Sequence, residues 1–463
     1  MLYYKLHVSL SLIILNYISM INRYAFKYLD QWSESEDRKP LILRGARQVG
    51  KTTLVIEFSK KFDVLLSLNL DKQEDKLLFE QYSNIQELTD AIYRHCKQQK
   101  KDGRTLLFID EIQNSPKAVA ILRYFYEEIK QLHVICAGSL LESLIDKHIS
   151  FPVGRVEYLP IRPCSFLEFL NGIGEDFDLD LVNTLNVSSV HHRVIALFTN
   201  FTIVGGMPAA INKYALKRDV LSVDKIYENL LNAYIDDVEK YARNESIAQI
   251  IRYILKNGWS FAAERITFER FGNSNYKSRE VSEAFRTIEK AMLLELVYPV
   301  TSSQIPLLTS TSHRPKLIWF DTGLVNYIAG VRESLFSVTD VMDAWRGRIA
   351  EHIVAQELLS MKWQVSAKRQ FWDRNKTQSS AEVDFVIQFK NWAIPIEVKS
   401  GHNAKLKSLH LFMEEAPHNI AVRIWSQPLS VDMVKTQSGK EFKLINVPFY
   451  YVCVLEKVLE KYS

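Results

Sequence analysis

The stretch "LRGARQVGKTTL" (residues 43–54) decides the fold of the first part of the chain. It follows the apolar run "LIL" (41–43) and leads into a segment whose apolar residues have helical spacing. A glycine-rich turn between a buried strand and a helix presents backbone N–H groups at the positive end of the helix dipole. Residues 45–52 fit the pattern Gly-x4-Gly-Lys-Ser/Thr in full. The stretch therefore predicts a loop that wraps nucleotide phosphates.

The residues of this loop have separate expected roles. Lys51 can reach the outer phosphates, and the Thr52 hydroxyl can hold Mg²⁺. Arg47 and Gln48 lie inside the loop and can contact either phosphates or a partner. The expected nucleotide contacts are Gly45, Arg47, Gln48, Val49, Gly50, Lys51, Thr52 and Thr53. A plain turn with a chance lysine is the alternative, but it does not explain why the motif follows a strand and opens a helix.

A second motif, "LLFIDEIQ" (106–113), delivers two acidic residues at the end of an apolar run. Asp110 is predicted to hold Mg²⁺ through water, and Glu111 to polarise the attacking water. By itself, an acidic pair after a strand is usually a solvated loop. Downstream of a complete phosphate loop, it indicates hydrolysis of the nucleotide. ATP is favoured because the sequence lacks the guanine-reading pattern Asn-Lys-x-Asp.

Two further positions fit such a site, each with an alternative. Ser139 closes the apolar run "HVICAGS" (133–139), where a polar residue can sense the terminal phosphate or cap the next helix. Arg155 can supply positive charge to the transferred phosphoryl group, in cis or from a neighbouring subunit. It is equally well explained as a surface arginine in a salt bridge.

The order of apolar runs predicts an α/β fold for the first part of the chain. Strands expected at 41–43, 64–70, 104–112 and 133–139 alternate with helical segments. Nearly continuous apolar strands of this kind form a parallel sheet that is covered on both faces. The total of 463 residues then leaves room for one or two further domains.

The net charge and the spacing of the cysteines argue against several classes of protein. The net charge of +4 is too weak to indicate a global attraction to nucleic acid, so any such affinity needs a local patch. The four cysteines have neither zinc-ligand nor redox-motif spacing. Reduced thiols and a cytoplasmic location are expected.

The amino-terminal segment resembles the apolar core of a signal peptide. "HVSLSLIILNYISM" (7–20) follows Lys5, but it is too short to span a bilayer and no small-residue cleavage site follows. Residues 1–21 are therefore expected to be a disordered leader or an over-extended start, because Met20 begins a natural first helix. Membrane attachment is the alternative, and no stable membrane association is expected.

The carboxy-terminal stretch "SSAEVDFVIQFKNWAIPIEVKSG" (379–401) predicts a second site. Asp384 lies in one expected strand, and Glu397 and Lys399 lie two apart in the next, so they share a face. Asp…Glu-x-Lys suits a metal-dependent phosphodiesterase, in which carboxylates bind Mg²⁺ and the lysine holds or deprotonates water. Glu351, on the preceding helix, can add an outer ligand. A two-stranded meander with a charged exposed face is the alternative.

The middle of the chain contains a helix that two interpretations fit. Its basic residues suit the second helix of a winged-helix unit that docks on DNA. Its interleaved glutamates are equally typical of a solvated helix with i,i+4 ion pairs. The residues concerned are Arg279, Arg286 and Lys290, interleaved with Glu280, Glu283 and Glu289.

Taken together, the motifs "GARQVGKTTL", "FIDEIQ", "GS" before apolar residues, "GR…LP…SFLEFL" and "GGMP" occur in an order that resembles a known family. These are AAA-type ATP-binding proteins of bacteria and archaea, whose carboxy-terminal region of unknown function resembles the restriction-endonuclease-like fold. The likeness covers nearly the whole chain from about residue 22. It implies an ATPase domain over 22–195, a helical and winged-helix-like domain over 196–335 and a nuclease-like α/β domain over 336–463.

The expected function is ATP hydrolysis coupled to nucleic-acid handling, with ATP, Mg²⁺ and DNA as partners and a homo-oligomer as a further possibility. The alternative is a nucleotide-dependent signalling or chaperone-like switch whose last domain is an inert binding module.

Overall fold

The first sheet is five-stranded and wholly parallel, as its apolar strands predict. The computed structural model describes residues 20–138, 154–330, 347–376, 379–399 and 406–463. Its strands lie in the spatial order β2-β3-β4-β1-β5. Their bounds are Leu41–Arg44 (β1), Val64–Asn69 (β2), Thr105–Asp110 (β3), His133–Gly138 (β4) and Glu157–Pro160 (β5). The α/β expectation for this part is confirmed.

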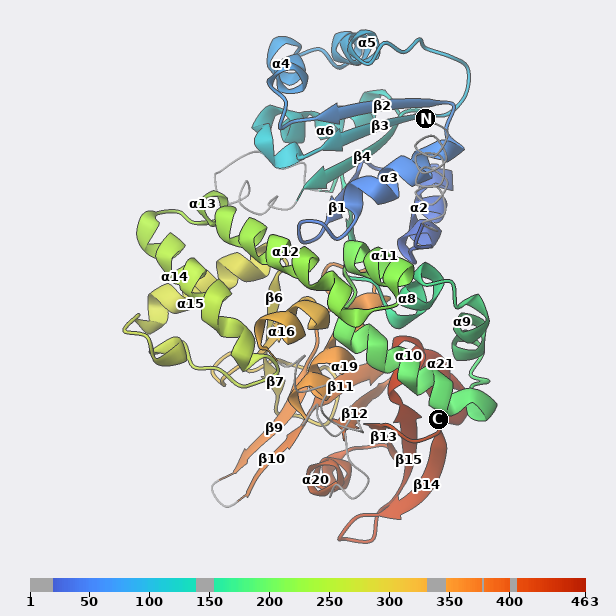
Figure 1. Ribbon diagram of the computed structural model, residues 1–463, viewed down its shortest axis with the longest axis vertical. Helices are drawn as coiled ribbons and strands as arrows, with labels where there is room; N and C mark the ends of the chain where they lie inside the picture. Colours follow the sequence, from blue (N-terminus) through green and yellow to red (C-terminus); the bar gives the residue numbers. More distant parts are fainter. Residues whose placement is uncertain (1–19, 139–153, 331–346, 377–378, 400–405) are drawn as a thin grey trace, which may run out of the picture.

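Successive side chains of β1 point to opposite faces of the first sheet and pack into two separate apolar cores. Leu41 and Leu43 pack on one face of the sheet, whereas Ile42 packs on the other. Helices α2 (Ala25–Glu34) and α3 (Lys51–Phe58) cover the first face. The opposite face is covered by α4 (Gln73–Gln81), α5 (Ile85–His95) and α6 (Pro116–Glu128) (Figure 1).

The middle of the chain is mainly helical, with a short antiparallel ladder of β6 and β8. The β6 and β8 strands lie within the apolar runs "LELVYPV" (294–300) and "KLIWF" (316–320). The elements are α8 (Phe166–Gly172), α9 (Asp176–Asn183), α10 (His191–Val204), α11 (Pro208–Lys217), α12 (Asp224–Asp236), α13 (Val238–Tyr241), α14 (Glu245–Asn257), α15 (Ser278–Lys290), β6 (Leu294–Val297), β7 (Pro299–Val300), β8 (Lys316–Trp319) and α16 (Thr322–Ile328).

The last part holds a mixed sheet in the order β11-β12-β13-β15-β14 and a protruding hairpin of β9 and β10 (Figure 1). The elements are α19 (Arg348–Ser360), β9 (Phe371–Lys376), β10 (Ser379–Val383), β11 (Phe385–Phe389), β12 (Trp392–Val398), α20 (Lys407–Glu415), β13 (Ile420–Trp425), β14 (Ser430–Lys435), β15 (Glu441–Pro448) and α21 (Leu455–Tyr462). Short 3-10 turns lie at Ser59–Lys61, Ile112–Asn114, Ser188–Val190, Val220–Val223, Gly258–Phe261, Phe271–Asn273 and Phe449–Val454.

The strand expected to contain Asp384, in "EVDFVIQF" (382–389), is not continuous in the structure. The extended segment is interrupted at Asp384, and the strands on either side of this residue join different sheets: β10 pairs with β9, and β11 pairs with β12. The Asp384 carboxylate accepts a hydrogen bond from the Val398 N–H at 2.7 Å. A side chain therefore replaces a backbone partner at the break, which a period-two pattern cannot reveal.

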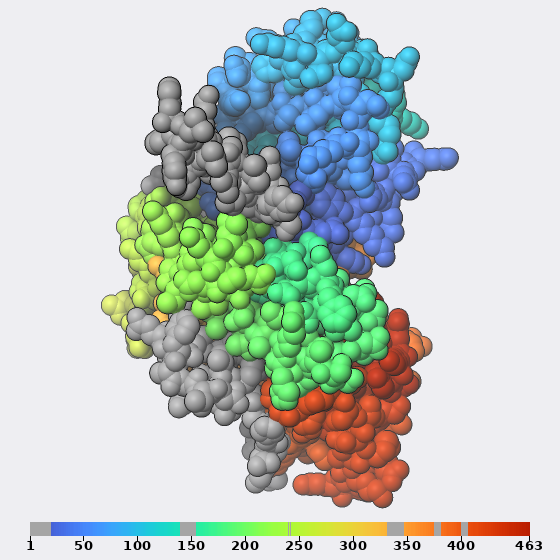
Figure 2. Space-filling model, turned by 45° about the vertical axis from the view of Figure 1, so that its right-hand side comes forward, coloured from blue at the N-terminus to red at the C-terminus, as the bar shows by residue number. Residues whose placement is uncertain are grey.

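The three parts follow one another along the long axis of the molecule (Figures 1 and 2). The face of the first sheet under α2 and α3 shares one continuous apolar cluster with the middle helices and with α19 and α21. The first sheet is therefore packed against the rest of the molecule rather than tethered to it. No helix among the described residues is long and apolar enough to cross a membrane.

One buried carboxylate joins two segments of the middle part. Asp321, with no exposed surface, accepts hydrogen bonds from the N–H groups of Gly206 (2.7 Å) and Leu324 (2.9 Å) and from the Tyr227 hydroxyl (3.0 Å). It thereby holds the turn "VGGMP" against the start of α16.

Replacing this carboxylate tests the junction. Asp321→Ala leaves several buried donors without a partner, so we expect the free energy of unfolding to fall by about 2–4 kcal/mol. The midpoint of urea unfolding is the measurement. Asp180→Ala removes an exposed carboxylate from α9 and should change stability little. Equal effects of both variants would contradict this account.

Candidate functional site

The predicted phosphate loop joins β1 to α3, as the mechanism requires. A Cβ atom at Gly45 would lie 2.3 Å from the Ile161 carbonyl oxygen, so only glycine fits there. Gly50 has φ 95°, a conformation that glycine adopts without strain. The loop therefore needs its two glycines for different reasons, one for close approach and one for backbone conformation.

Lys51, the first residue of α3, is almost fully buried under the loop. Its ammonium group donates hydrogen bonds to the carbonyl oxygens of Gly45 and Ala46, both at 2.9 Å. This leaves one of its three N–H donors for a phosphate. Burial lowers the pKa of Lys51 to about 8, although the carboxylates of Glu111 and Asp110 oppose the shift.

The two predicted halves of the nucleotide site meet. Strands β1 and β3 flank β4 and run parallel, so their carboxyl ends lie at one edge of the sheet. There the Thr52 hydroxyl donates to the Asp110 carboxylate at 2.8 Å. Glu111 follows with φ 51°, and its carboxylate accepts a hydrogen bond from the Gln113 amide. Burial raises the pKa of Glu111.

The Thr52 and Asp110 pair fits an Mg²⁺ ion of the kind that ATP carries. Mg²⁺ is commonly bound by one or two protein oxygens together with phosphates and water. No group of three or more His, Cys, Asp or Glu side chains in the described ranges could hold a metal by itself. A hydroxyl and a carboxylate in contact are nevertheless oxygen ligands of the kind that Mg²⁺ takes together with phosphates and water.

Arg23, which the sequence reasoning missed, supports the phosphate loop through hydrogen bonds. Arg23 is buried and donates to the Val49 carbonyl (3.0 Å), to the Arg162 carbonyl (2.6 Å) and to the Glu168 carboxylate (3.0 Å). Glu168 is held in turn by a capping box with Ser165 at the start of α8. The spacing Ser-x-x-Glu in "SFLEFL" was the available signal.

Within the loop, Arg47 contacts the protein's own middle part. Its guanidinium pairs with Asp237 at 2.5 Å, and its carbonyl accepts a hydrogen bond from the Tyr234 hydroxyl at 3.0 Å. The Tyr234 ring also meets the Phe320 ring edge-on, with centroids 5.8 Å apart. Phe320 follows β8 directly. The loop is therefore linked through α12 to β8.

Arg155 does not lie near the phosphate loop of its own chain. Leu41 pairs with Glu157 and Arg44 with Pro160, so Arg155 precedes the amino end of β5 while the loop follows the carboxyl end of β1. Its guanidinium pairs with Glu127 at 2.8 Å. A role in cis is contradicted by this placement, and a role in trans stays a prediction. Ser139 lies outside the described residues.

The predicted carboxy-terminal residues come together. Glu397 on β12 pairs with Lys399 at 2.7 Å, as their shared face predicts, and Ile396 and Val398 are buried on the other side. Glu397 is itself only 4% exposed, and its second oxygen, Oε2, has no hydrogen-bond partner. Asp384 is close enough to contribute to the raised pKa of Glu397.

Lys316 and Glu382 complete this carboxylate cluster, and neither was predicted. The Lys316 ammonium contacts Glu351 at 2.5 Å and Glu382 at 2.6 Å. Lys316 opens β8, so it comes from the middle part of the chain. The signal available in the sequence was a lysine at the first position of the apolar run "KLIWF".

The cluster holds its charges in a buried setting. Burial raises the pKa of Glu351 to about 8, although Lys316 opposes the shift. Burial, and then the charge of Asp384, raises the pKa of Glu397 to about 7. Burial of Lys316 favours loss of its proton, but Glu351 and Asp384 outweigh this and raise its pKa. With the lysine charged and two carboxyls prone to protonation, the cluster does not fit a divalent ion as it stands.

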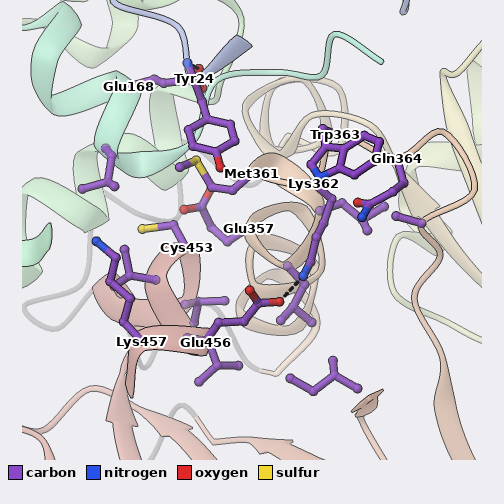
Figure 3. Close-up of a pocket in the computed structure, with 18 of the residues that line it drawn as sticks. Tyr24, Glu168, Glu357, Met361, Lys362, Trp363, Gln364, Cys453, Glu456 and Lys457 are labelled. Atoms are coloured by element: carbon purple, nitrogen blue, oxygen red, sulfur yellow. Dashed lines mark hydrogen bonds and ion pairs between the residues drawn. The ribbon is translucent and has the colours of Figure 1, made fainter. Parts of the chain in front are cut away.

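A cleft of about 1710 Å³ lies between α2 and α8 on one side and α19 and α21 on the other (Figure 3). Glu357 of α19 lies in it beside Cys453, and its Oε2 accepts a hydrogen bond from the Phe166 N–H at 3.1 Å. Burial raises the pKa of Glu357 to about 8. The cleft lies at the junction of the first part of the chain with α19 and belongs to neither predicted site.

Comparison with known families now identifies the class of the first part. Residues 37–170 match the family described as an AAA domain. With the parallel sheet and the phosphate loop, they have the fold of an AAA-type P-loop ATPase. Residues 195–335 and 346–448 match two domains of unknown function, DUF8612 and DUF4143. No curated protein matches the chain.

Solved structures give looser likenesses. The Walker-type ATPase PABY2304 of Pyrococcus abyssi is 11% identical, with 67% of this chain and 96% of that chain covered and a TM-score of 0.40. Drosophila ORC bound to DNA is 14% identical over 67% and 94% of the chains, with a TM-score of 0.29. Aeropyrum pernix ORC1 in complex with DNA is 12% identical over 70% and 96%, with a TM-score of 0.28.

A pH series tests the setting of Lys51. Because its pKa is about 8, the ammonium loses its proton above that pH, and ATP must then bind together with a proton. We expect the affinity for a non-hydrolysable ATP analogue to be level below pH 8 and to fall by about tenfold per pH unit well above it. Isothermal titration between pH 7 and 9.5 measures this. Thr52→Ala retains Lys51 and should show the same slope at lower affinity, whereas a flat wild-type profile would contradict the assignment.

Proposed function

We propose that the protein binds and hydrolyses ATP with Mg²⁺ and couples this turnover to nucleic-acid handling by its carboxy-terminal domain. The observation that carries the ATPase assignment is the contact between Thr52 and Asp110 beside the buried Lys51. Backbone N–H groups of residues 45–52 would hold the phosphates, and Lys51 would neutralise them. Glu111 would orient the attacking water once Gln113 releases it.

Contacts between the loop and the rest of the chain support coupling. Arg23 connects the Val49 carbonyl to the Arg162 backbone. The Arg162 guanidinium donates to the carbonyl oxygens of Lys362 and Gln364 (3.1 Å to Gln364), just beyond the end of α19. Because Glu351 lies in the first turn of the same helix, a shift of the loop could be transmitted to the carboxylate cluster.

Two sets of residues support nucleic acid as the target. Asp384, Glu397 and Lys399 form the residue set of a phosphodiesterase-type site, in a restriction-endonuclease-like domain as the family resemblance implies. The exposed Arg279, Arg286 and Lys290 of α15 offer a basic face for DNA.

The four cysteines are free, as expected in the cytoplasm. A homo-oligomer would allow Arg155 to act in trans.

The alternative function is a nucleotide-dependent switch with an inert binding module at its end. The specific observation in its favour is Lys316, which neutralises the carboxylates that a nuclease would need.

A single substitution tests hydrolysis. Glu111→Gln removes the carboxylate that orients water but leaves the phosphate contacts, so we expect turnover to fall by about 10²–10⁴-fold with analogue affinity retained. Release of inorganic phosphate is the measurement. Glu128→Gln, at the exposed end of α6, is the matched control and should keep wild-type turnover. Undiminished hydrolysis in Glu111→Gln would refute its role.

DNA distinguishes the two functions. We expect single- or double-stranded DNA to stimulate ATP turnover, with the stimulation weakened by salt because phosphate contacts release counterions. The double variant Arg279→Glu and Arg286→Glu should lose most of the stimulation while basal turnover persists, and Lys51→Ala should have no turnover with or without DNA. If no DNA affects turnover of the wild type, the switch with a protein partner is the better account.

A further inference from the structure

Lys316 is placed as an internal counter-ion rather than as a surface lysine. It is 2% exposed, and its ammonium lies between the Glu351 and Glu382 carboxylates at 2.5 and 2.6 Å. The rings of Phe371 and Phe385 also lie near it, with centroids at 4.8 and 6.0 Å. A lysine so deeply buried is stabilised mainly by the carboxylates that surround it.

The other charges around the cluster show why this lysine matters. Glu382 has a second partner, Arg265, at 2.6 Å, and Arg265 also pairs with Asp373 at 3.0 Å. Lys399 pairs with Glu397 and is a quarter exposed. Of these three cations, only Lys316 contacts Glu351, and its pKa is raised further by Asp384. Lys316 therefore occupies the interior of the cluster, whereas Arg265 and Lys399 approach it from its sides.

An unpartnered oxygen shows that the cluster retains capacity for a ligand. Glu397 Oε2 is buried and accepts no hydrogen bond, although Oε1 is paired with Lys399. A buried carboxylate oxygen without a partner is costly, and such atoms commonly mark the place of an ion or a water. The cluster thus combines a free buried acceptor with a lysine at its centre.

We propose that Lys316, supplied by the middle part of the chain, closes the cluster of Glu351, Asp384 and Glu397 to divalent cations. The inference concerns regulation of the carboxy-terminal site and rests on the proposed function only for what an opened site would act on. While the ammonium pairs with Glu351, a divalent ion that binds this carboxylate meets a unit positive charge beside it. Removal of that charge, with the carboxylates retained, opens the site to the ion.

Binding of Mn²⁺ tests the proposal, measured by the loss of the free-ion signal in electron paramagnetic resonance. All proteins carry Asp110→Asn and are studied without nucleotide, so that the ATP site contributes neither metal binding nor activity. We expect Lys316→Met to bind Mn²⁺ about tenfold or more tightly than the Lys316 protein, because a unit charge is removed beside the ligands. Lys399→Met is the comparison variant: it removes the charge beside Glu397 but leaves the Lys316 ammonium on Glu351, so its gain in affinity should be well below that of Lys316→Met. Adding Glu351→Gln to Lys316→Met should abolish the gain.

The outcomes that overturn the proposal are equally definite. If the protein with Lys316 intact binds Mn²⁺ at the carboxylate cluster as tightly as Lys316→Met, the lysine does not close the site. The same holds if Lys399→Met gains as much affinity. If Lys316→Met does not fold, Lys316→Gln, which keeps a hydrogen-bond donor for Glu351, takes its place. The protein with Lys316 intact is still measured, and tight Mn²⁺ binding at its carboxylate cluster would by itself contradict the proposal. Because ATP turnover is absent from every sample, failure of the ATPase assignment would not change these results.

Discussion

The hydrogen bond between the Thr52 hydroxyl and the Asp110 carboxylate, 2.8 Å long, is the contact on which the proposed nucleotide site depends. Thr52 is placed by the glycine turn that ends β1, and Asp110 by the end of β3 two strands away. They meet because parallel strands bring their carboxyl ends to the same edge of the sheet. That edge also carries Lys51 and Glu111, so the groups proposed to bind phosphate, metal and water share one small region.

The nucleotide site is not isolated from the other domains. Arg23 connects the phosphate loop to Glu168 and Arg162 through hydrogen bonds. Tyr234 of α12 donates a hydrogen bond to the loop and contacts the ring of Phe320. Arg162 in turn contacts Lys362 and Gln364 just beyond α19, and Phe320 directly follows β8. These two elements carry Glu351 and Lys316 of the carboxy-terminal cluster. Together with the shared apolar cluster, they offer a physical route by which the two sites could influence each other.

Much of the first part could be predicted because its signals are local. The strand-to-helix turn, the acidic strand end and the apolar strands each lie within a few residues. The contacts of Lys316 could not be predicted, because its partners Glu351 and Glu382 follow 35 and 66 positions later and only the fold brings them together. For Arg155 the sequence left a role in cis, a role in trans and a surface salt bridge open, because spacing along the chain does not say which end of a strand faces the nucleotide. The break at Asp384 was missed because both flanking segments are extended.

A crystal structure with Mg²⁺ and a non-hydrolysable ATP analogue tests the central claim most directly. The account predicts phosphates within hydrogen-bond distance of the N–H groups of residues 45–52, with the metal held by the Thr52 hydroxyl and facing Asp110. A nucleotide bound elsewhere, or a metal that contacts neither residue, would contradict it.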